Sequence, residues 1–264
     1  MGGTAVVTGA SRGIGRGIAL ALAERGFDVA ITARTVSPGT GPDGLPGSLD
    51  ETAAEIEAAG RRAIPVRLDL TERDRIVPTV EQLVSDHGPI DVLVNNAIYV
   101  GPGQLDRFVD VDPDELDRRI FGNLTAQLWI AQPVARAMAA RGRGTIVNVT
   151  SAAGMHDPPS PVGEGGWAIG YGTSKGGFHR MAGIVAAELG PSGVRCFNVE
   201  PGFVATERAV RDPRLGWVAE RGKPPAVVGA VVAWLLEQPD GVVANGSTVS
   251  TDTVAADLGI WRAA

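Results

Sequence analysis

Short apolar runs alternate with longer helix-like segments along the whole chain, and this alternation limits the possible folds more than any other feature. The apolar runs are expected to be strands, at residues 4–8, 27–32, 63–68, 91–95, 144–150 and 194–199, and a final strand is expected near residues 246–250. Helical spacing of the apolar residues predicts helices over residues 14–25, 48–59, 72–87, 113–141 and 171–189. Continuous apolar stretches such as Val92–Val94 are typical of strands buried on both faces of a parallel sheet.

This pattern predicts an α/β fold, a Rossmann-type doubly wound parallel sheet with helices on both faces. No repeat, linker or second core interrupts the alternation, so we expect residues 1–264 to form a single domain. Residues 36–47 are rich in Gly and Pro and are expected to form a loop at the rim of the fold. After this loop, Ser48 and Glu51 have the capping-box spacing of a helix start.

Composition and charge narrow the range of partners. The net charge of −6 and the absence of a basic run exclude a general nucleic-acid binder and favour a small-molecule substrate. The single cysteine, Cys196, allows no internal disulfide and fits a reducing compartment. No run reaches the roughly 18 apolar residues of a membrane span, and the first residues lack the pattern of a signal peptide. We therefore expect a cytoplasmic protein with no membrane partner.

A glycine-rich turn, Thr8-Gly9-Ala10-Ser11-Arg12-Gly13-Ile14-Gly15, joins the first expected strand to the first expected helix. In this position Gly9 permits a tight turn, Gly13 lets the backbone approach a pyrophosphate, and Gly15 lets the helix pack against the strand. The N-terminus of the helix offers unpaired N–H groups and a positive dipole to the phosphates. The turn therefore predicts a dinucleotide site, the alternative being a plain strand-to-helix connection.

The end of the second expected strand indicates which dinucleotide is bound. An acidic residue there would accept a hydrogen bond from the ribose 2′-hydroxyl of NAD, but the chain has Ala33 and Arg34. The Arg34 guanidinium suits a 2′-phosphate, and Arg12 is placed to add a second cation, so we expect NADP (NADPH) rather than NAD. Alternatively, Arg34 is a solvated rim residue or stacks on adenine in either cofactor. Asp69 is expected to accept from the adenine amino group, or else to be a turn residue.

Tyr171 and Lys175 are four positions apart at the start of an expected helix and therefore share one face. A nearby ammonium group and a nicotinamide's positive charge would favour the phenolate form of Tyr171. Ser151 follows an apolar strand, at the edge where open α/β sheets bind ligands, and its hydroxyl is available to a substrate oxygen. Asn123 is a poor helix former within an expected helix. It either holds a water that relays protons to Lys175 or is a buried polar residue bonded to the backbone.

Together these residues resemble the short-chain dehydrogenase/reductase family over nearly the whole chain. The resemblance is carried, in the family's order, by the TGASRGIG turn at residues 8–15, Asp69, Asn95-Asn96-Ala97, Asn123, Ser151, the Tyr171/Lys175 pair and Pro201-Gly202 with Thr206. Candidate cofactor contacts are Gly9, Ser11, Arg12, Gly13, Ile14, Gly15, Arg34, Asp69, Leu70, Asn96, Ala97, Tyr171, Lys175, Pro201, Gly202, Val204 and Thr206.

The resemblance also implies roles for the site residues. Tyr171 would be the general acid/base, Ser151 would orient the substrate carbonyl, and Lys175 would lower the tyrosine pKa and bind ribose. Asn123 would complete a proton relay, and Thr206 would hold the nicotinamide carboxamide. A homodimer or homotetramer is the family expectation.

Several features depart from the common family pattern. Ile98 replaces the glycine of the usual NNAG motif, and Tyr99 follows it. Together with the loop segment 45–49, these residues look like the branch that contains dehydrogenase/reductase member 1, whose substrates are carbonyl compounds and steroids. The long spacer at residues 152–170 is expected to shape the mouth of the pocket. At the C-terminus, Ser250-Thr251-Asp252 replaces a glycine-rich ending, which weakens any inference about a tetramer interface.

The remaining candidates have simpler interpretations. Trp129 is expected in the core, whereas Trp167 and Phe203 lie beside catalytic positions and are candidates for an apolar pocket. Glu200 either selects substrate or faces solvent, and Cys196 is expected to be buried and inert. The three histidines have no ligand spacing, so no metal site is expected.

The favoured function is an NADP-dependent oxidoreductase that reduces a ketone or aldehyde, with an apolar compound as substrate. The alternatives are the oxidative direction on the hydroxyl of an apolar metabolite, a cofactor-using isomerase or dehydratase, and a non-catalytic nucleotide sensor. The joint presence of Ser151, Tyr171 and Lys175 counts against the sensor.

Overall fold

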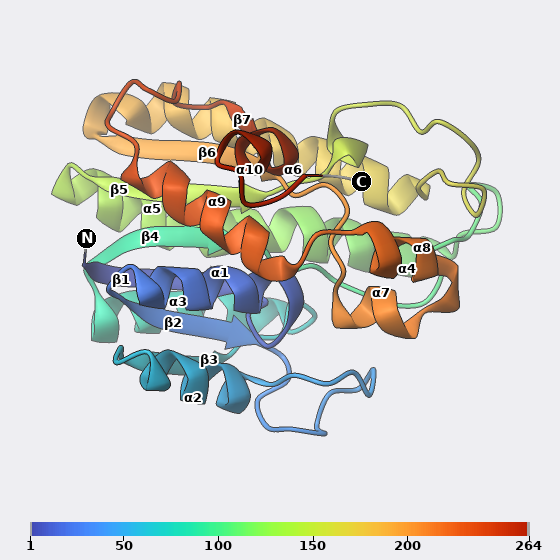
Figure 1. Cartoon of the computed structure of the whole chain (residues 1–264), viewed down its shortest axis with the longest axis horizontal. Helices are drawn as coiled ribbons and strands as arrows, with labels where there is room; N and C mark the ends of the chain where they lie inside the picture. The colour runs from blue at the N-terminus through green and yellow to red at the C-terminus, as the bar shows by residue number, and fades with distance from the viewer. Residues whose placement is uncertain (1, 263–264) are drawn as a thin grey trace.

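The computed structural model describes residues 2–262, which form one seven-stranded sheet (Figure 1). The strands are β1 (Gly3–Thr8), β2 (Phe27–Ala33), β3 (Ala63–Arg67), β4 (Ile90–Asn95), β5 (Gly144–Val149), β6 (Val194–Glu200) and β7 (Thr248–Ser250). They lie in the order β3-β2-β1-β4-β5-β6-β7, and every neighbouring pair is parallel. The predicted doubly wound α/β fold is confirmed.

The helices connect these strands. The α-helices are α1 (Gly13–Glu24), α2 (Leu49–Ala58), α3 (Arg73–His87), α4 (Pro113–Ile120), α5 (Ala126–Arg141), α6 (Ile169–Leu189), α7 (Glu207–Arg211), α8 (Gly216–Arg221), α9 (Pro225–Glu237) and α10 (Thr251–Asp257). The shorter turns are the π-helical η1 (Phe121–Thr125) and the 3₁₀ turns η2 (Ala152–Gly154), η3 (Gly190–Ser192) and η4 (Pro213–Leu215).

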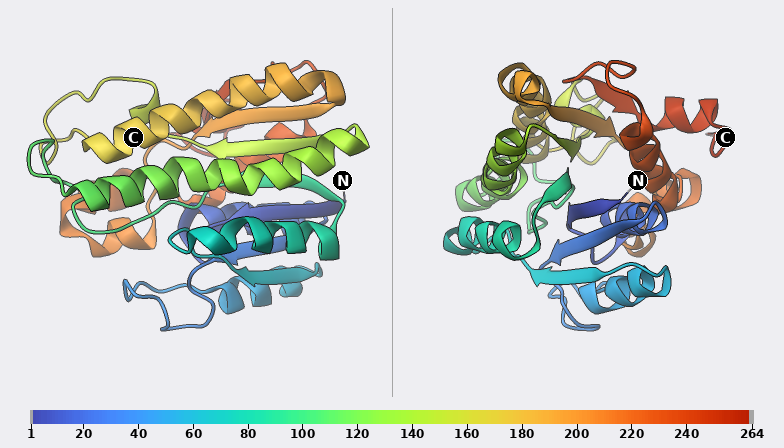
Figure 2. Two further views of the ribbon diagram at one scale, coloured as in Figure 1. Left: turned by 180° about the vertical axis from the view of Figure 1, so that it is seen from behind. Right: turned by 90° about the vertical axis from the view of Figure 1, so that its left-hand side faces the viewer.

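Two helical layers enclose the sheet, as the end-on view on the right of Figure 2 shows. Helices α1, α2 and α9 cover one face, where Ile18, Leu22 and Val231 are fully buried. Helices α3, α5 and α6 cover the other face, where Ile130 and Phe178 are buried. Both faces of the strands are therefore apolar, which explains the continuous apolar runs in the sequence.

The carboxyl ends of the strands meet at one edge of the sheet, on the right in Figure 1. Strand β1 lies between β2 and β4, so the chain runs outward in opposite directions on either side of it. Ligands of open α/β sheets bind outside the carboxyl ends at such a switch point. The predicted loop 36–47, the segment 152–168 and helices α7 and α8 all lie at this edge.

Ser48 caps α2 as predicted. Its Oγ accepts a hydrogen bond from the Glu51 N–H at 3.1 Å and donates to Glu51 Oε2 at 2.8 Å. The buried Leu49 then fixes the start of this helix against the core.

The segment predicted as one helix, residues 113–141, is helical throughout, but its α-helical pattern is interrupted. A π-helical turn, η1, separates α4 from α5 and contains Asn123. The Gln127 side chain donates to the Gly122 carbonyl oxygen at 2.9 Å, which satisfies an acceptor where the regular helical pattern is interrupted.

Helices α7, α8, α9 and α10 were not predicted. Helix α9 is apolar on all sides because it is buried, so it shows no amphipathic period. Helices α7 and α8 have five and six residues, too few for a periodic signal.

The expectation that Trp129 lies in the core is wrong. Its side chain is 37% exposed and packs edge-on against Phe121, with ring centroids 5.1 Å apart. Trp129 lies on the solvent side of α5, where the aromatic contact replaces burial in the sheet core.

Candidate active site

The glycine-rich turn between β1 and α1 has a backbone that favours glycine. Gly9 (φ +68°) and Gly13 (φ +54°) lie in the left-handed region. A Cβ on Gly15 would lie 2.3 Å from the Gly9 carbonyl oxygen and would push α1 away from the turn. The first turn of α1 has no side-chain cap and no acidic residue, so its N–H groups face the edge of the sheet without a side-chain partner.

Side chains from β1 and β4 fix this turn in place. Thr8 Oγ1 accepts hydrogen bonds from the N–H groups of Asn96 and Ala97, at 2.9 and 3.0 Å. Asn96 Nδ2 donates to the Thr8 carbonyl oxygen at 2.8 Å. The end of β4 is therefore joined to the glycine-rich turn at the switch point.

A cleft of about 310 Å³ opens above the turn. It brings together most of the predicted cofactor residues, namely Gly9, Ser11, Arg12, Gly13, Ile14, Gly15, Arg34, Asp69, Leu70, Asn96, Ala97, Tyr171, Lys175, Pro201 and Thr206. The predicted residues Asn123, Ser151, Gly202 and Val204 lie outside its lining. Residues that the sequence reasoning did not propose as contacts also line it, namely Ala33, Thr35, Asp43, Ile98, Tyr99, Val100, Val149, Thr150, Glu207 and Arg208.

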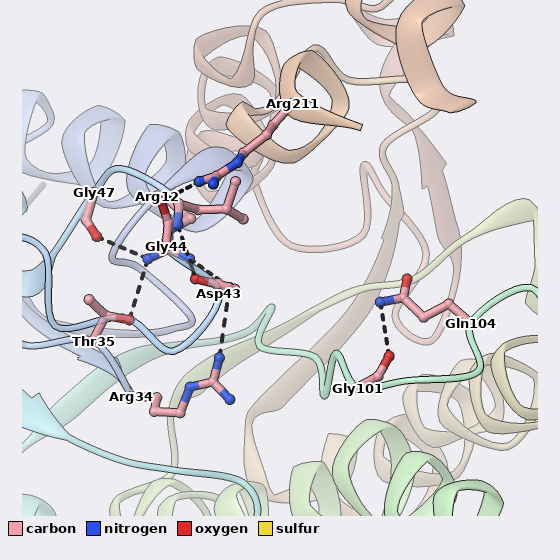
Figure 3. A network of polar contacts seen from close by, with 10 residues as sticks. Arg12, Arg34, Thr35, Asp43, Gly44, Gly47, Gly101, Gln104 and Arg211 are labelled. Atoms are coloured by element: carbon pink, nitrogen blue, oxygen red, sulfur yellow. Dashed lines mark hydrogen bonds and ion pairs between the residues drawn. The ribbon is translucent and has the colours of Figure 1, made fainter. Parts of the chain in front are cut away.

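Both arginines at the β2 end of the cleft already have an acidic partner in the structure. Arg12 Nη1 lies 3.0 Å from Asp43 Oδ2, and Arg34 Nη2 lies 3.7 Å from the same oxygen (Figure 3). No pattern in the Gly- and Pro-rich loop distinguishes Asp43 as a site residue. Asp43 is 31 positions from Arg12 in the sequence, so their contact could not be predicted from spacing.

Asp69 has the turn role that was its alternative interpretation. Its Oδ1 accepts from the Thr71 N–H at 2.9 Å and from Thr71 Oγ1 at 2.8 Å. Its Oδ2 lies 4.0 Å from Arg67 Nη2. The side chain still lines the cleft, which keeps the adenine contact as a hypothesis.

Tyr171 and Lys175 lie on the same face of α6 and line the cleft together. Lys175 is buried, its Nζ donates to the Val149 carbonyl oxygen at 2.9 Å, and burial lowers the pKa of this amine to about 8. Burial raises the pKa of Tyr171, and the charge of Glu200 raises it further. A hydrogen bond from Ser151 lowers this pKa, but only in part. Burial thus favours the neutral phenol, and the Lys175 ammonium donates to a backbone carbonyl oxygen. The expected phenolate also depended on the positive charge of a nicotinamide and stays a prediction.

Ser151 and Asn123 lie beside this pair. Ser151 Oγ accepts from the Ala153 N–H at 3.2 Å, so the strand-end turn role is present together with the contact to Tyr171. Asn123 Oδ1 accepts from the Tyr99 N–H at 2.7 Å, and its Nδ2 donates to Ser174 Oγ at 3.4 Å. The Asn123 amide thus bonds the backbone, as the alternative interpretation predicted. It also contacts Ser174, the residue before Lys175.

The turn after β6 closes the other side of the cleft. Glu200 Oε1 accepts from the Gly202 N–H at 2.8 Å, so this carboxylate orders the turn, a role that neither predicted interpretation included. Thr206 Oγ1 caps α7 through the Ala209 N–H at 3.4 Å. Val204 is buried beneath the turn rather than facing the cleft.

Of the apolar residues expected near the pocket, Trp167 and Phe203 lie outside the lining of the cleft. Ile98 lines it and is 43% exposed. Phe203 is exposed and packs edge-on against Trp217, with centroids 4.6 Å apart, outside the lining of the cleft. Trp167, in the long spacer, is half-buried and lies near the position a Gly172 Cβ would occupy.

Other sequence expectations concern residues outside the cleft. Cys196 is buried as predicted, and burial raises the pKa of its thiol to about 12, which keeps it protonated. Within residues 2–262, no group of three His, Cys, Asp or Glu side chains is arranged to hold a metal ion. No helix in the same range is long and apolar enough to cross a membrane.

A glycine-lined cleft above an uncapped helix N-terminus, at the switch point of a doubly wound sheet, is typical of a dinucleotide-binding enzyme. Comparison with known proteins gives the family. Residues 3–214 match the short chain dehydrogenase family, and the chain belongs to it. It is an oxidoreductase of the short-chain dehydrogenase/reductase type.

Relatives cover nearly the whole chain. Gluconate 5-dehydrogenase of Gluconobacter oxydans is 33% identical over 95% of this chain and 93% of its own. A 3-oxoacyl-acyl-carrier-protein reductase of Brucella melitensis in complex with NAD has a TM-score of 0.76 at 28% identity, over 94% of this chain and 95% of its own. A putative NAD(P)-dependent gluconate 5-dehydrogenase of Beutenbergia cavernae with bound NADP has a TM-score of 0.78 at 26% identity, over 95% of both chains. The first of these two structures contains NAD and the second contains NADP, so both cofactors occur in the family.

Proposed function

We propose that this chain is an NADP-dependent reductase of an apolar ketone or aldehyde, with Tyr171 as the general acid. The observation that carries the proposal is a tyrosine that lines the cleft, contacts Ser151 and has a raised pKa. At neutral pH such a phenol keeps its proton, and a protonated phenol is the form that donates to a carbonyl oxygen. Raising the pH favours the reverse direction, because it removes this proton.

The residues of the cleft fit a nicotinamide dinucleotide. Gly9 and Gly13 leave the backbone uncovered at the N-terminus of α1, where a pyrophosphate would bind. Arg12 Nε and Glu207 Oε2 are buried without a hydrogen-bond partner among residues 2–262, so each has bonding capacity left for a ligand. Arg12 and Arg34 together favour a cofactor that carries a 2′-phosphate.

The bound cofactor would supply the hydride in this reaction. Ser151 donates a hydrogen bond to the substrate carbonyl oxygen and orients it toward Tyr171. The Tyr171 Oη then gives its proton to that oxygen as it gains negative charge. Lys175, on the next turn of α6, would bind ribose hydroxyls of the cofactor in place of the Val149 carbonyl oxygen and would bring a positive charge near the resulting phenolate. Asn123 orders the turn that carries Tyr99 and holds Ser174 near the proton path.

Part of the cleft lining supports an apolar substrate. Ile98, Tyr99 and Val100 face the cleft there. Contacts from these side chains remove apolar surface from water and bind a hydrocarbon portion of the substrate.

The test replaces the two tyrosines of the chain separately, since both line the same cleft. Tyr171→Phe should lower kcat for NADPH-dependent reduction of an aldehyde and ketone panel by about 10²-fold or more, because general acid catalysis is lost. Tyr99→Phe removes a phenol that is bonded to Glu115 and should change kcat far less. Dissociation constants for NADPH and NADH, measured by fluorescence titration, should be nearly unchanged in Tyr171→Phe and should favour NADPH.

The outcomes separate the candidate functions. Equal loss in both tyrosine variants would overturn the role of Tyr171. Tight NADPH binding by the wild type without turnover on any carbonyl or alcohol would instead favour a nucleotide sensor.

A further inference from the structure

The carboxylate of Asp43 stands between the two arginines at the β2 end of the cleft, in the close view of Figure 3. Its oxygens accept from Arg12 Nη1 at 3.1 and 3.0 Å, and Oδ2 lies 3.7 Å from Arg34 Nη2. Asp43 belongs to the loop between β2 and α2, so it reaches this place from outside the glycine-rich turn. The carboxylate uses the guanidinium edge that an anionic ligand of this cleft would need.

The other donors of Arg12 fix its orientation. Nη2 donates to Thr35 Oγ1 at 3.3 Å and to the Gly47 carbonyl oxygen at 3.0 Å. The side chain is only 16% exposed. Arg12 therefore cannot turn freely toward solvent, and a ligand of its Nη1 group must approach where Asp43 now lies.

The loop holds Asp43 in position by contacts of its own. The Leu45 N–H donates to Asp43 Oδ1 at 3.3 Å, and the Leu45 side chain is buried. Arg211 of α7 donates to the Gly44 carbonyl oxygen across the edge of the cleft (Figure 3). Gly44 has a φ of +60°, which lets the chain turn there and present the carboxylate inward.

The charges around Asp43 are mostly positive. Arg208 of α7 also lines this part of the cleft. Burial lowers the pKa of Arg208, Asp43 raises it in part, and the neighbouring Arg12 and Arg34 lower it. Burial alone would raise the pKa of Asp43, but the Leu45 N–H and the guanidinium groups of Arg12 and Arg34 bring it below its ordinary value. Asp43 is therefore ionised at neutral pH and cancels part of the positive charge.

We propose that Asp43 is a cofactor-specificity residue, whose carboxylate competes with the 2′-phosphate of NADP for the guanidinium groups of Arg12 and Arg34. The inference rests on the proposed NADP site. It adds that the affinity for NADP is held down by the chain's own loop, whereas the affinity for NAD is not. The preference for NADP over NAD is therefore smaller than two arginines alone would give.

The experiment measures binding without any substrate. Dissociation constants for NADPH and NADH are determined by fluorescence titration for the wild type and for Asp43→Asn. Removing the competing charge should tighten NADPH binding by about tenfold, the strength of one charge-assisted hydrogen bond, and change NADH binding by less than about threefold. Adenosine 2′,5′-bisphosphate and AMP, compared by calorimetry, should repeat this difference and assign it to the 2′-phosphate.

Two controls separate competition from a general charge effect. Glu57→Gln removes one exposed negative charge from the neighbouring helix α2 and should leave both affinities unchanged. In an Arg12→Gln background, Asp43→Asn should tighten NADPH binding by clearly less than tenfold, because only the more distant Arg34 donor is left to release. Thermal melting of each variant verifies that it is folded.

The results distinguish this inference from the proposed function. Weaker NADH binding by Asp43→Asn with unchanged NADPH binding would overturn the inference, because Asp43 would then be a ribose contact. Equal tightening of both cofactors would overturn it as well. A wild type that prefers NADH refutes the proposed NADP preference, yet selective tightening of NADPH by Asp43→Asn would still support the competition.

Discussion

At the scale of single residues, burial reverses the electrostatics that spacing alone suggests. Tyr171 and Lys175 share a helix face, as their spacing predicts, but the Lys175 ammonium is directed to the Val149 carbonyl oxygen. The environment that disfavours charge on Lys175 also disfavours the phenolate of Tyr171. That the two side chains share one helix face could be predicted from the sequence. The directions of their pKa shifts could not, because desolvation depends on segments distant in the chain.

The lowered pKa of Lys175 makes stability depend on pH. The amine has an ordinary pKa of 10.5 and a pKa of about 8 in the folded chain. Between these two pKa values the unfolded chain binds more protons than the folded chain, so stability rises with pH through this window. Below pH 8 the free-energy cost of burying the charged amine is fully present. The difference corresponds to about 3 kcal/mol at most.

Lys175→Met should therefore raise the free energy of unfolding at pH 7 by about 1–2 kcal/mol, after about 1 kcal/mol for the lost bond to Val149. It should abolish turnover at the same time. Urea denaturation from pH 7 to 10.5 checks this, and the gain over wild type should shrink as the pH rises. Lys175→Arg keeps the charge and should show no gain at pH 7. A gain that is constant with pH would contradict the role of the buried charge.

At the scale of elements, the sequence predicted regular pieces better than irregular ones. All seven strands were placed, most of them because their apolar runs are continuous; β7, with Val249 as its one apolar residue, lacks such a run. The π-helical turn η1 was missed, since it is set by tertiary contacts: the Asn123 side chain bonds the Tyr99 N–H, and Gly122 lies against Tyr99. The bond between Asn123 and Tyr99 joins residues that are 24 positions apart.

Gly122→Ala tests whether η1 positions the site. A Cβ at this position would lie 2.4 Å from the Tyr99 Cβ, so Tyr99 and the Asn123 bond must shift. We expect a loss of about 1–3 kcal/mol in the free energy of unfolding, and a lower kcat. Gly183→Ala in α6 is the matched control, because a Cβ there meets nothing within 4 Å and should stabilise the helix by about 0.5–1 kcal/mol. Similar effects of the two variants on kcat would refute the positioning role of η1.

At the scale of the whole molecule, the candidate site joins segments from residue 9 to residue 208. Local motifs predicted the parts of the cleft whose residues are close in the sequence, such as the glycine-rich turn and the Tyr171/Lys175 pair. The contact of Asp43 with Arg12 spans 31 positions, and its loop path leaves no periodic signal in the sequence. Lys223 is a second such case: it is buried at 2% exposure and joins the turn after β6 to the C-terminal helix α10.

The Lys223 ammonium shows how the C-terminal segment supports the cleft. Its Nζ donates to the Pro201 carbonyl oxygen at 2.6 Å and to the Phe203 carbonyl oxygen at 3.3 Å, and it lies 2.7 Å from Asp252 Oδ1. The two carbonyls belong to the turn that borders the cleft, whereas Asp252 lies in α10. A single buried cation thus joins the turn after β6 to helix α10.

Asp252→Asn should leave this buried ammonium without its counter-charge. Because Asp252 is 49% exposed, we expect a loss of about 1–3 kcal/mol in the free energy of unfolding rather than the full cost of an unpaired buried charge. The turn at Pro201 should loosen as well, so the dissociation constants for NADPH and NADH should rise together. Asp240→Asn is the control, because Asp240 is 92% exposed in its pair with Arg195 and should change stability by less than about 0.5 kcal/mol. Urea denaturation and cofactor titration measure both effects. If Asp252→Asn behaved like Asp240→Asn in both, the C-terminal helix would have no part in supporting the cleft.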